Sequence, residues 1–352
     1  MAQYSAKEIG RRSGQRVVMS KLTIVLLFAA LLSACGAQQS ANSNTNTNTK
    51  PTPPVASPKP DVELQKQTAE IAKEAKGTVG VFATVIETGQ SVALNENAHF
   101  ALQSVVKVPI AMAVLKKVEE GNLDLKEKIG VTKEDFVPSS MRSPIRNNNP
   151  NGVELTIREL IRFAISESDG TASDVLQHRA GDAKGVQAYI DSVGVQGIHV
   201  ERTHKEFGLD WNKQYDNWAT PTAVADLLKK LLSADGISGE NREILIRFMT
   251  ESDNPANRIL AGVPLGTVVA HKTGTGGTLN GIAAATNDVG IITLPNGNHI
   301  VIAIFVGDSK ANAPTRESVI AKITKAIFDK WSVAKTDEPA KNANANKRHS
   351  TE

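Results

Sequence analysis

Residues 100–123 read FALQSVVKVPIAMAVLKKVEEGNL, and this stretch places a hydroxyl and an ammonium group where an apolar helix begins. Ser104 and Lys107 are three residues apart, so on a helix they share one face. At the first turn Ser104 would also lie near free backbone N–H groups and the positive end of the helix dipole. A serine becomes a strong nucleophile only when a base takes its proton, and a lysine whose pKa is lowered by burial can act as that base. The pair therefore predicts either an activated nucleophile or, more simply, an N-cap serine beside a surface lysine.

Two further short motifs follow later in the chain. Ser168-Asp169-Gly170 is predicted to close a helix in the middle region, and HKTGT at residues 271–275 is predicted to lie on a strand. Their order and spacing resemble those of the serine β-lactamase and penicillin-binding-protein superfamily, whose motifs are S-x-x-K, S-D-N and K-T-G. Each motif is weak alone, and the three in this order carry the resemblance.

Sequence outside the motifs resembles class A serine β-lactamases, in particular the extended-spectrum PER-type branch. The segments that carry this likeness are LQSVVK, AMAVLKKVEEGNLDL, QYDNW, GTVVAHKTGT and AATNDVGII. The resemblance implies a hydrolase that opens the β-lactam amide through an acyl-serine intermediate and confers antibiotic resistance. It implies no cofactor and no metal.

The resemblance also implies roles for individual residues. Ser104 would attack the lactam carbonyl, Lys107 would share in proton transfer, and Ser168 would relay a proton to the leaving nitrogen. The backbone N–H groups of Ser104 and Thr275 would form an oxyanion hole, worth about 10²–10³ in rate per donor. For Lys272 the simpler alternative is an edge-strand charge that prevents aggregation. The residues implied to bind substrate are Gly170, Lys272, Thr273, Gly274 and Thr275.

The chain departs from the family pattern at its second motif. The family has Asn where this chain has Gly170. We expect a weaker grip on the substrate side chain as a result. The alternative is that Gly170 merely ends or bends a helix. Alignment also places Arg142 where the family often has an aromatic residue, and this cation would favour anionic substrates or simply be solvated.

A second departure concerns the base that activates the deacylating water, which in class A enzymes is a Glu in an Ω loop. Counting back from QYDNWATP places His204 at that position and Glu206 two residues later. Glu206 could act through a reshaped loop, and we favour this reading. His204 could act itself because imidazole titrates near neutral pH. Otherwise no base is present, the acyl-enzyme persists, and both residues belong to an exposed loop. Glu201 and Glu167 are reserve candidates.

The pattern of apolar residues predicts an α/β (α+β) fold, with β structure at both ends of the domain and helices in the middle. A capping box at residues 156–159 and Thr220-Pro221 mark two of the central helices. We expect a five-stranded antiparallel sheet flanked by terminal helices, an inserted all-helical subdomain, and an active site in the groove between them. The expected strands are residues 78–86, 91–94, 266–273, 281–294 and 299–306, with a hairpin turn at 295–298, and the terminal helices are 62–76 and 314–331.

Residues 1–35 resemble a secretory signal peptide with a lipobox. Lys21 precedes the apolar run LTIVLLFAALLSAC, which ends at Cys35, the only cysteine of the chain. We expect Cys35 to be lipidated and the protein to be exported to the periplasm or cell surface. The alternative is a signal peptide that happens to end in Cys. Residues 36–60 and 336–352 are polar and predicted to be disordered, so residues 61–335 form the catalytic domain.

Composition narrows the partners. The formal net charge of +3 is too small to indicate nucleic-acid binding. The histidines are scattered and the single thiol is assigned to lipidation, so no metal site is expected. We expect a monomer whose partners are β-lactam substrates and a membrane, the latter through the lipid. Two rival functions remain: a D-Ala-D-Ala carboxypeptidase or transpeptidase-like protein that acylates but deacylates slowly, and a non-catalytic ligand-binding lipoprotein.

Overall fold

The computed structural model describes residues 57, 59–252 and 255–332. The predicted signal peptide, Cys35, nearly all of the predicted linker and the predicted tail lie outside the described residues. Within the described residues, no helix combines the length and the apolar character needed to cross a membrane.

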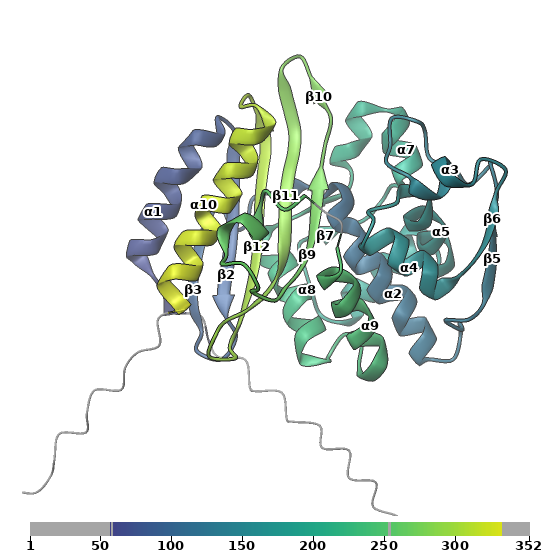
Figure 1. Cartoon of the computed structure of the whole chain (residues 1–352), viewed down its shortest axis with the longest axis horizontal. Coiled ribbons are helices and arrows are strands. Elements are labelled where there is room, and N and C mark those ends of the chain that lie inside the picture. Colours follow the sequence, from purple (N-terminus) through teal and green to yellow (C-terminus); the bar gives the residue numbers. More distant parts are fainter. Residues whose placement is uncertain (1–56, 58, 253–254, 333–352) are drawn as a thin grey trace, which may run out of the picture. The chain divides into compact units, whose positions relative to one another are not determined.

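A central sheet is formed by segments from both ends of the described chain (Figure 1). Its long strands pair antiparallel, as predicted. A short strand from the end of the predicted linker pairs in parallel with the strand Gln90–Leu94. After Gly276-Gly277, a second short strand, Thr278–Leu279, continues the line of Val269–Thr275 along Ile282–Thr293. In sheet order the strands are β1 (Lys59–Pro60), β3 (Gln90–Leu94), β2 (Thr78–Val85), β12 (His299–Ser309) and β11 (Ile282–Thr293), followed by β9 (Val269–Thr275) and β10 (Thr278–Leu279).

Strand β12 is buried on both faces of the sheet. Ile300, Ile302 and Ile304 pack in one apolar cluster. The alternate residues Val301 and Phe305 pack in a second cluster on the other face. Because successive side chains of a strand point to opposite faces, a continuous apolar run is the pattern of a strand covered on both sides.

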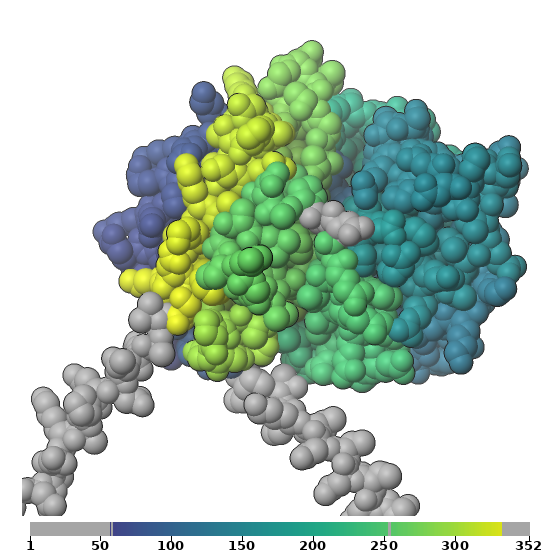
Figure 2. Space-filling view, viewed as in Figure 1, coloured from purple at the N-terminus to yellow at the C-terminus, as the bar shows by residue number. Residues whose placement is uncertain are grey.

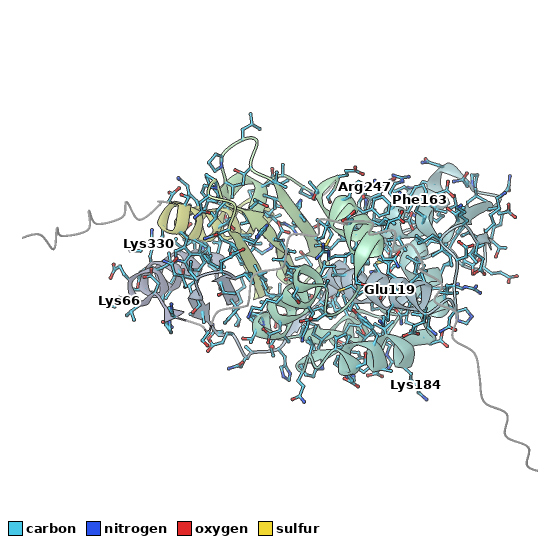
Figure 3. All side chains as sticks on the ribbon, turned by 90° about the horizontal axis from the view of Figure 1, so that it is seen from below. Lys66, Glu119, Phe163, Lys184, Arg247 and Lys330 are labelled. Atoms are coloured by element: carbon cyan, nitrogen blue, oxygen red, sulfur yellow. The ribbon has the colours of Figure 1, made fainter. Side chains whose placement is uncertain are left out.

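The two terminal helices cover one face of the sheet (Figures 1 and 2). They are α1 (Val62–Ala72), extended by a 3₁₀ turn at Lys73–Ala75, and α10 (Ala313–Ser332). Leu64 of α1 and Trp331 of α10 are buried in the same cluster. Lys66 and Lys330 lie on the exposed sides of these helices and point away from the body of the domain (Figure 3).

The other face of the sheet meets the inserted middle region, which is mainly helical, as predicted. Thr156 and Glu159 form the predicted capping box, and Thr220 caps the helix that begins at Pro221. The α-helices of this region are α2 (Lys107–Glu119), α3 (Pro144–Asn148), α4 (Ile157–Ile165), α5 (Gly170–Ala180), α6 (Asp182–Ser192), α7 (His204–Leu209), α8 (Pro221–Ser233) and α9 (Gly239–Thr250).

The inserted region is not all-helical, because two small antiparallel sheets lie within it. Strand β5 (Lys128–Val131) pairs with β6 (Val153–Thr156). Strand β8 (Trp218–Ala219) lies between β4 (Phe100–Ala101) and β7 (Ile198–His199). These strands are two to four residues long and pair across long loops, so no local sequence pattern marks them. The remaining 3₁₀ turns are Gln103–Val106, Trp211–Tyr215 and Ile259–Gly262.

Candidate active site

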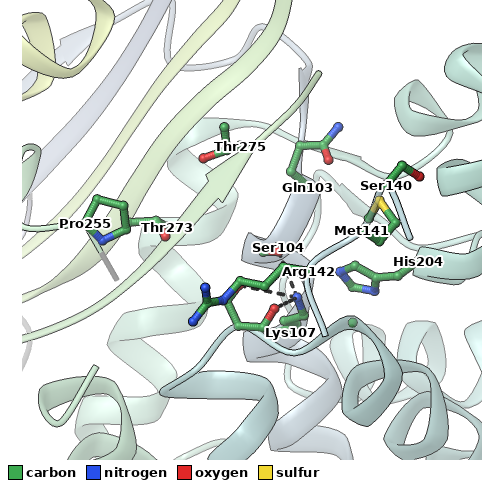
Figure 4. A pocket seen from close by; sticks show the side chains of 12 residues that line it. Gln103, Ser104, Lys107, Ser140, Met141, Arg142, His204, Pro255, Thr273 and Thr275 are labelled. Atoms are coloured by element: carbon green, nitrogen blue, oxygen red, sulfur yellow. Dashed lines mark hydrogen bonds between the residues drawn. The ribbon is translucent and has the colours of Figure 1, made fainter. Parts of the chain in front are cut away.

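A pocket of about 410 Å³ gathers the three sequence motifs at the junction of the sheet and the helical region (Figure 4). Its lining comes from the start of α2, the turn before α5, the start of α7 and strand β9. The lining residues are Gln103, Ser104, Lys107, Ser140, Met141, Arg142, Ser168, Gly170, His204, Pro255, Thr273 and Thr275.

Ser104 and Lys107 form a direct hydrogen bond at the start of α2. Ser104 lies in the 3₁₀ turn that leads into the helix, and Lys107 is the first residue of the helix. The Nζ of Lys107 donates to Ser104 Oγ at 2.8 Å and to the carbonyl of Ser168 at 3.0 Å. Only 1% of Lys107 is exposed, and burial lowers its pKa to about 7. The alternative of a surface lysine is therefore wrong, and a neutral amine is accessible near pH 7.

Ser168 lies between two lysines in the turn that joins α4 to α5. Its Oγ accepts a hydrogen bond from Lys272 Nζ at 2.9 Å and one from Lys107 Nζ at 3.4 Å. The backbone of Ser168 has a φ of 56°, in the left-handed region that a non-glycine residue seldom adopts. Such conformations persist where surrounding contacts over-determine them, and here the two lysines do so. The motif does not close a helix: α4 ends at Ile165, and Asp169 caps α5.

Strand β9 carries the third motif along one wall of the pocket. Thr273 and Thr275 line the pocket, and Lys272 is fully buried beside it. Burial, and after it the positive charge of Lys107, hold the pKa of Lys272 well below its usual value. An exposed edge-strand charge would not show this burial, so that alternative is wrong. Gly274 lets the strand approach the Ser104 turn closely because it has no Cβ. A Cβ at this position would lie 2.7 Å from the carbonyl oxygen of Leu102.

Gly170 lines the pocket as the first residue of α5. It therefore begins a helix, and the alternative that it ends one is wrong. Its N–H donates to the carbonyl of Arg142 at 2.9 Å. Arg142 also lines the pocket, and its Nε donates to the carbonyl of Glu167 at 2.6 Å. The pair thus fixes one rim of the pocket.

Glu206 is directed into a capping box at the start of α7. Its Oε2 accepts hydrogen bonds from the backbone N–H and the hydroxyl of Thr203, at 2.8 and 3.0 Å. The side chain is 43% exposed, and Glu206 is not among the described residues that line the pocket. The reserve candidates Glu201 and Glu167 form ion pairs with Arg202 and Arg162. The structure therefore does not bring the favoured carboxylate to Ser104.

His204 reaches the pocket instead. It is the first residue of α7, is 1% exposed and lines the pocket with Ser104 and Lys107. Its Nδ1 lies 3.2 Å from Asp174 Oδ1, whereas its buried Nε2 has no hydrogen-bond partner among the described residues. Burial and then the charge of Lys107 lower the pKa of His204 to about 4, so the imidazole is neutral near pH 7.

The described residues hold no group of three or more His, Cys, Asp or Glu side chains that could bind a metal ion. The titratable side chains that line the pocket are Lys107, Arg142 and His204. The chemistry that this arrangement supports is nucleophilic attack by a serine beside a lysine of lowered pKa.

Comparison with known proteins places this site in a family. The beta-lactamase enzyme family matches residues 63–331, which include all three motifs. The chain belongs to the beta-lactamase enzyme family.

Two relatives and a solved structure illustrate the membership. Beta-lactamase VEB-1 of Pseudomonas aeruginosa is 40% identical over 73% of this chain and 86% of its own length. The extended-spectrum beta-lactamase PER-1 of the same species is 32% identical over 75% of this chain and 86% of its own length. The crystal structure of a beta-lactamase from Chitinophaga pinensis is similar with a TM-score of 0.74 and 39% identity, over 76% of this chain and 99% of that one. The predicted resemblance is confirmed.

The sequence did not identify two residues that support the site of this beta-lactamase family member. Asp174 holds the ring of His204, and Arg258 donates to Thr275 Oγ1 at 2.8 Å and to the carbonyl of Gly274 at 3.1 Å. No local pattern identifies either residue, because the partners are 16 or more residues away along the chain. The position of Glu206 did have a signal, since Thr203-His204-Lys205-Glu206 matches the capping-box pattern that identified α4.

Proposed function

We propose that this protein hydrolyses β-lactams through an acyl-enzyme formed on Ser104. The observation that carries this proposal is the 2.8 Å hydrogen bond between Ser104 Oγ and the buried Nζ of Lys107. A lysine with a pKa of about 7 is a base at neutral pH, and its Nζ lies within hydrogen-bonding distance of the hydroxyl whose proton must be removed. Family membership supports the same reaction.

In the first step the neutral amine of Lys107 takes the hydroxyl proton, and Ser104 Oγ bonds to the lactam carbonyl carbon. The carbonyl oxygen takes up the electron pair, and the backbone N–H groups of Ser104 and Thr275, two residues of the lining, would stabilise it. The C–N bond then breaks. The leaving nitrogen receives a proton through Ser168, whose Oγ accepts hydrogen bonds from both lysines.

The positive charges around the pocket suit a substrate that carries a carboxylate. The Nζ of Lys272 donates a hydrogen bond to Ser168 Oγ, and Arg142 lies on the rim of the pocket. Thr273 and Thr275 supply hydroxyl groups to the lining. A carboxylate would be attracted by these cations and oriented by the two hydroxyls. In the second step a water molecule attacks the ester, the bond to Oγ breaks, and Ser104 regains its proton.

A single experiment tests this proposal. The purified residues 57–332 are mixed with a chromogenic cephalosporin, while absorbance follows product and intact mass follows adduct. Many product molecules per protein, with loss of both product and adduct in Ser104→Ala, support hydrolysis. A lasting adduct on Ser104 indicates the slowly deacylating transpeptidase-like protein. No adduct and no product indicate the ligand-binding lipoprotein.

We also propose that the chain is exported and lipidated at Cys35 and that the catalytic domain, residues 61–335, is a monomer. The basic and apolar segments before Cys35 support export, and the position of the only thiol supports lipidation. Expression of the full chain should give a membrane fraction that incorporates labelled fatty acid. Cys35→Ala should lose the label, and retention of the label would contradict lipidation at this residue. Light scattering on the purified domain should give the mass of one chain.

A further inference from the structure

We propose that His204, held by Asp174, is the base that activates water for hydrolysis of the acyl-enzyme. The inference rests on the proposed function and assigns the residue that its second step requires. A general base must be within reach of the reacting water, must carry a free lone pair and must be unprotonated at the working pH.

His204 shares the pocket with the nucleophile, and the first condition requires such a location. The side chain lines the same pocket as Ser104 and Lys107, and its ring faces this pair in the close view (Figure 4). The ring is fixed in place because it is 1% exposed and packs against Phe207, with 4.8 Å between ring centroids. A mobile loop residue would not be constrained in this way.

Asp174 determines which ring nitrogen carries the hydrogen. The carboxylate can only accept, so the contact of 3.2 Å between His204 Nδ1 and Asp174 Oδ1 places the hydrogen on Nδ1. The same carboxylate accepts the backbone N–H groups of His204 and Lys205 at 2.7 and 2.8 Å, which anchors the start of α7. The lone pair is therefore on Nε2.

Nε2 of His204 is buried and has no hydrogen-bond partner among the described residues. A buried polar atom without a partner is destabilising, so its presence in a pocket calls for an explanation. A water molecule bound there would satisfy the nitrogen. That water would lie in the pocket that holds Ser104, as the second step of the reaction requires.

The charges around His204 keep the imidazole neutral. The charged groups that face it are Asp174 on α5, Lys107 on α2 and Lys272 on β9. Burial and the two lysines outweigh the carboxylate, and the resulting pKa of about 4 leaves the ring unprotonated at neutral pH. When the ring takes a proton from water, Asp174 stabilises the imidazolium that forms.

The other candidate bases are less well placed. None of the described residues that line the pocket is Asp or Glu, and Glu206 accepts two hydrogen bonds within its capping box. Lys107 is the remaining base in the lining, and its Nζ already donates to Ser104 and to Ser168. His204 is thus the lining residue whose basic atom has no hydrogen-bond partner among the described residues.

The step balances without any further reactant. The water oxygen bonds to the ester carbonyl carbon while one water proton passes to His204 Nε2. The tetrahedral intermediate collapses, and the bond between that carbon and Ser104 Oγ breaks. The proton then returns from Nε2 to Oγ, which leaves the free serine, the neutral imidazole and the carboxylic acid product.

The test measures acylation and deacylation separately in the full chain with a chromogenic cephalosporin. Rapid mixing gives the acylation burst, and intact mass follows decay of the adduct. In His204→Ala and His204→Gln we expect a full burst and a deacylation rate lower by about 10²–10⁴-fold. The matched control is His178→Gln, because His178 also pairs with an aspartate, Asp182, at 2.8 Å but lies exposed on α5.

A second variant separates positioning from folding. An asparagine at position 174 can donate as well as accept, so Asp174→Asn no longer fixes the tautomer of His204. We expect slower deacylation and a changed pH profile of the deacylation rate. The acylation burst should remain, which would show that the site is still folded. If both His204 variants fail to acylate, Asp174→Asn becomes the test of the proposal. An unchanged deacylation rate in Asp174→Asn overturns it.

Other outcomes also overturn the proposal. Turnover at the wild-type rate in either His204 variant would show that Lys107 or another group suffices. Accumulation of adduct in Glu206→Gln, which keeps the capping geometry, would assign the role to that carboxylate. A lasting adduct on the wild-type protein would also overturn the proposal, because it would show that the pocket has no competent base for deacylation. A wild-type protein that gives neither adduct nor product instead refutes the proposed function itself.

Discussion

At the scale of single residues, the ionisation of Lys107 should control the first step of the reaction. The buried ammonium is disfavoured, and the pKa is lowered to about 7 despite the nearby carboxylates of Asp169 and Asp174. Above this pH the amine is neutral and can take the proton of Ser104. Below it the amine is protonated and cannot act as a base.

We therefore expect the acylation rate to rise about tenfold per pH unit below pH 7 and to level off above it. Acylation bursts measured between pH 5 and 9 would check this profile. Lys107→Arg keeps the charge but cannot lose its proton, so it should acylate slowly at every pH in that range. A wild-type rate that does not change between pH 5 and 7 would contradict this role for Lys107.

The residues of the site were predictable where the signal was a short motif. Ser104, Lys107, Ser168 and Lys272 were all identified from three motifs, and the structure brings them together within hydrogen-bonding distance. Glu206 was favoured as the base because it is an acid two residues from the expected position. This prediction did not take into account that Glu206 completes a capping box, which directs its carboxylate to Thr203.

At the scale of elements, the close approach of β9 to the turn that holds Ser104 depends on Gly274. A Cβ at this position would lie 2.7 Å from Leu102 O and 3.2 Å from a methyl group of Val105. Gly274→Ala should therefore push the strand away from the turn and separate the substrate-binding side chains from the nucleophile.

For Gly274→Ala we expect a loss of kcat/KM of about 10²-fold, which a displacement of roughly 1 Å can cause. Steady-state kinetics would measure it. Gly130→Ala is the matched control, since a Cβ there meets nothing within 4 Å. Equal kinetics in the two variants would show that the spacing between β9 and the Ser104 turn is unimportant.

Two helices in the inserted region begin with the same capping box, and only one of them carries a pocket residue. Thr203→Ala and Thr156→Ala should each lower the free energy of unfolding by about 0.5–2 kcal/mol, since each removes one cap. Urea denaturation would measure both losses. We expect slower deacylation in Thr203→Ala alone because α7 holds His204. The same slowing in Thr156→Ala would contradict a specific role for α7.

Elements with local signals were predicted well. The hairpin between β11 and β12, the capping box of α4 and the proline-initiated start of α8 are each encoded within a few residues. The short strands β4, β7 and β8 were missed because each is two residues long and pairs with a distant segment: β7 lies about 20 positions from β8, and β4 lies more than 110 positions from β8. Such pairings leave no periodic pattern in so few residues.

At the scale of the whole domain, the face of the sheet opposite the inserted region depends on helices from the two ends of the described chain. Trp331, near the end of α10, is 4% exposed and packs with Leu64 in one cluster. Removing this side chain would leave a large cavity between α10 and the layer beneath it.

For Trp331→Ala we expect a loss of about 3–5 kcal/mol in the free energy of unfolding, because burial and cavity terms add. The kinetics of the remaining folded protein should be unchanged, since the helix lies on the face away from the pocket. Val62→Ala on α1 is the control, as Val62 is 60% exposed and its loss should change stability by at most about 0.5 kcal/mol. Equal losses in the two variants would contradict the packing described.

The pairing of β2 with β12 has a consequence for how the protein is made. β2 is among the first segments of the domain to leave the ribosome, and its neighbour in the sheet is among the last. Until synthesis is nearly complete, β2 has only β3 beside it, and a two-stranded hairpin is at best marginally stable in water. The central sheet therefore cannot be completed until the last part of the domain has been synthesised, and the edge of β2 is open to chaperones for most of translation.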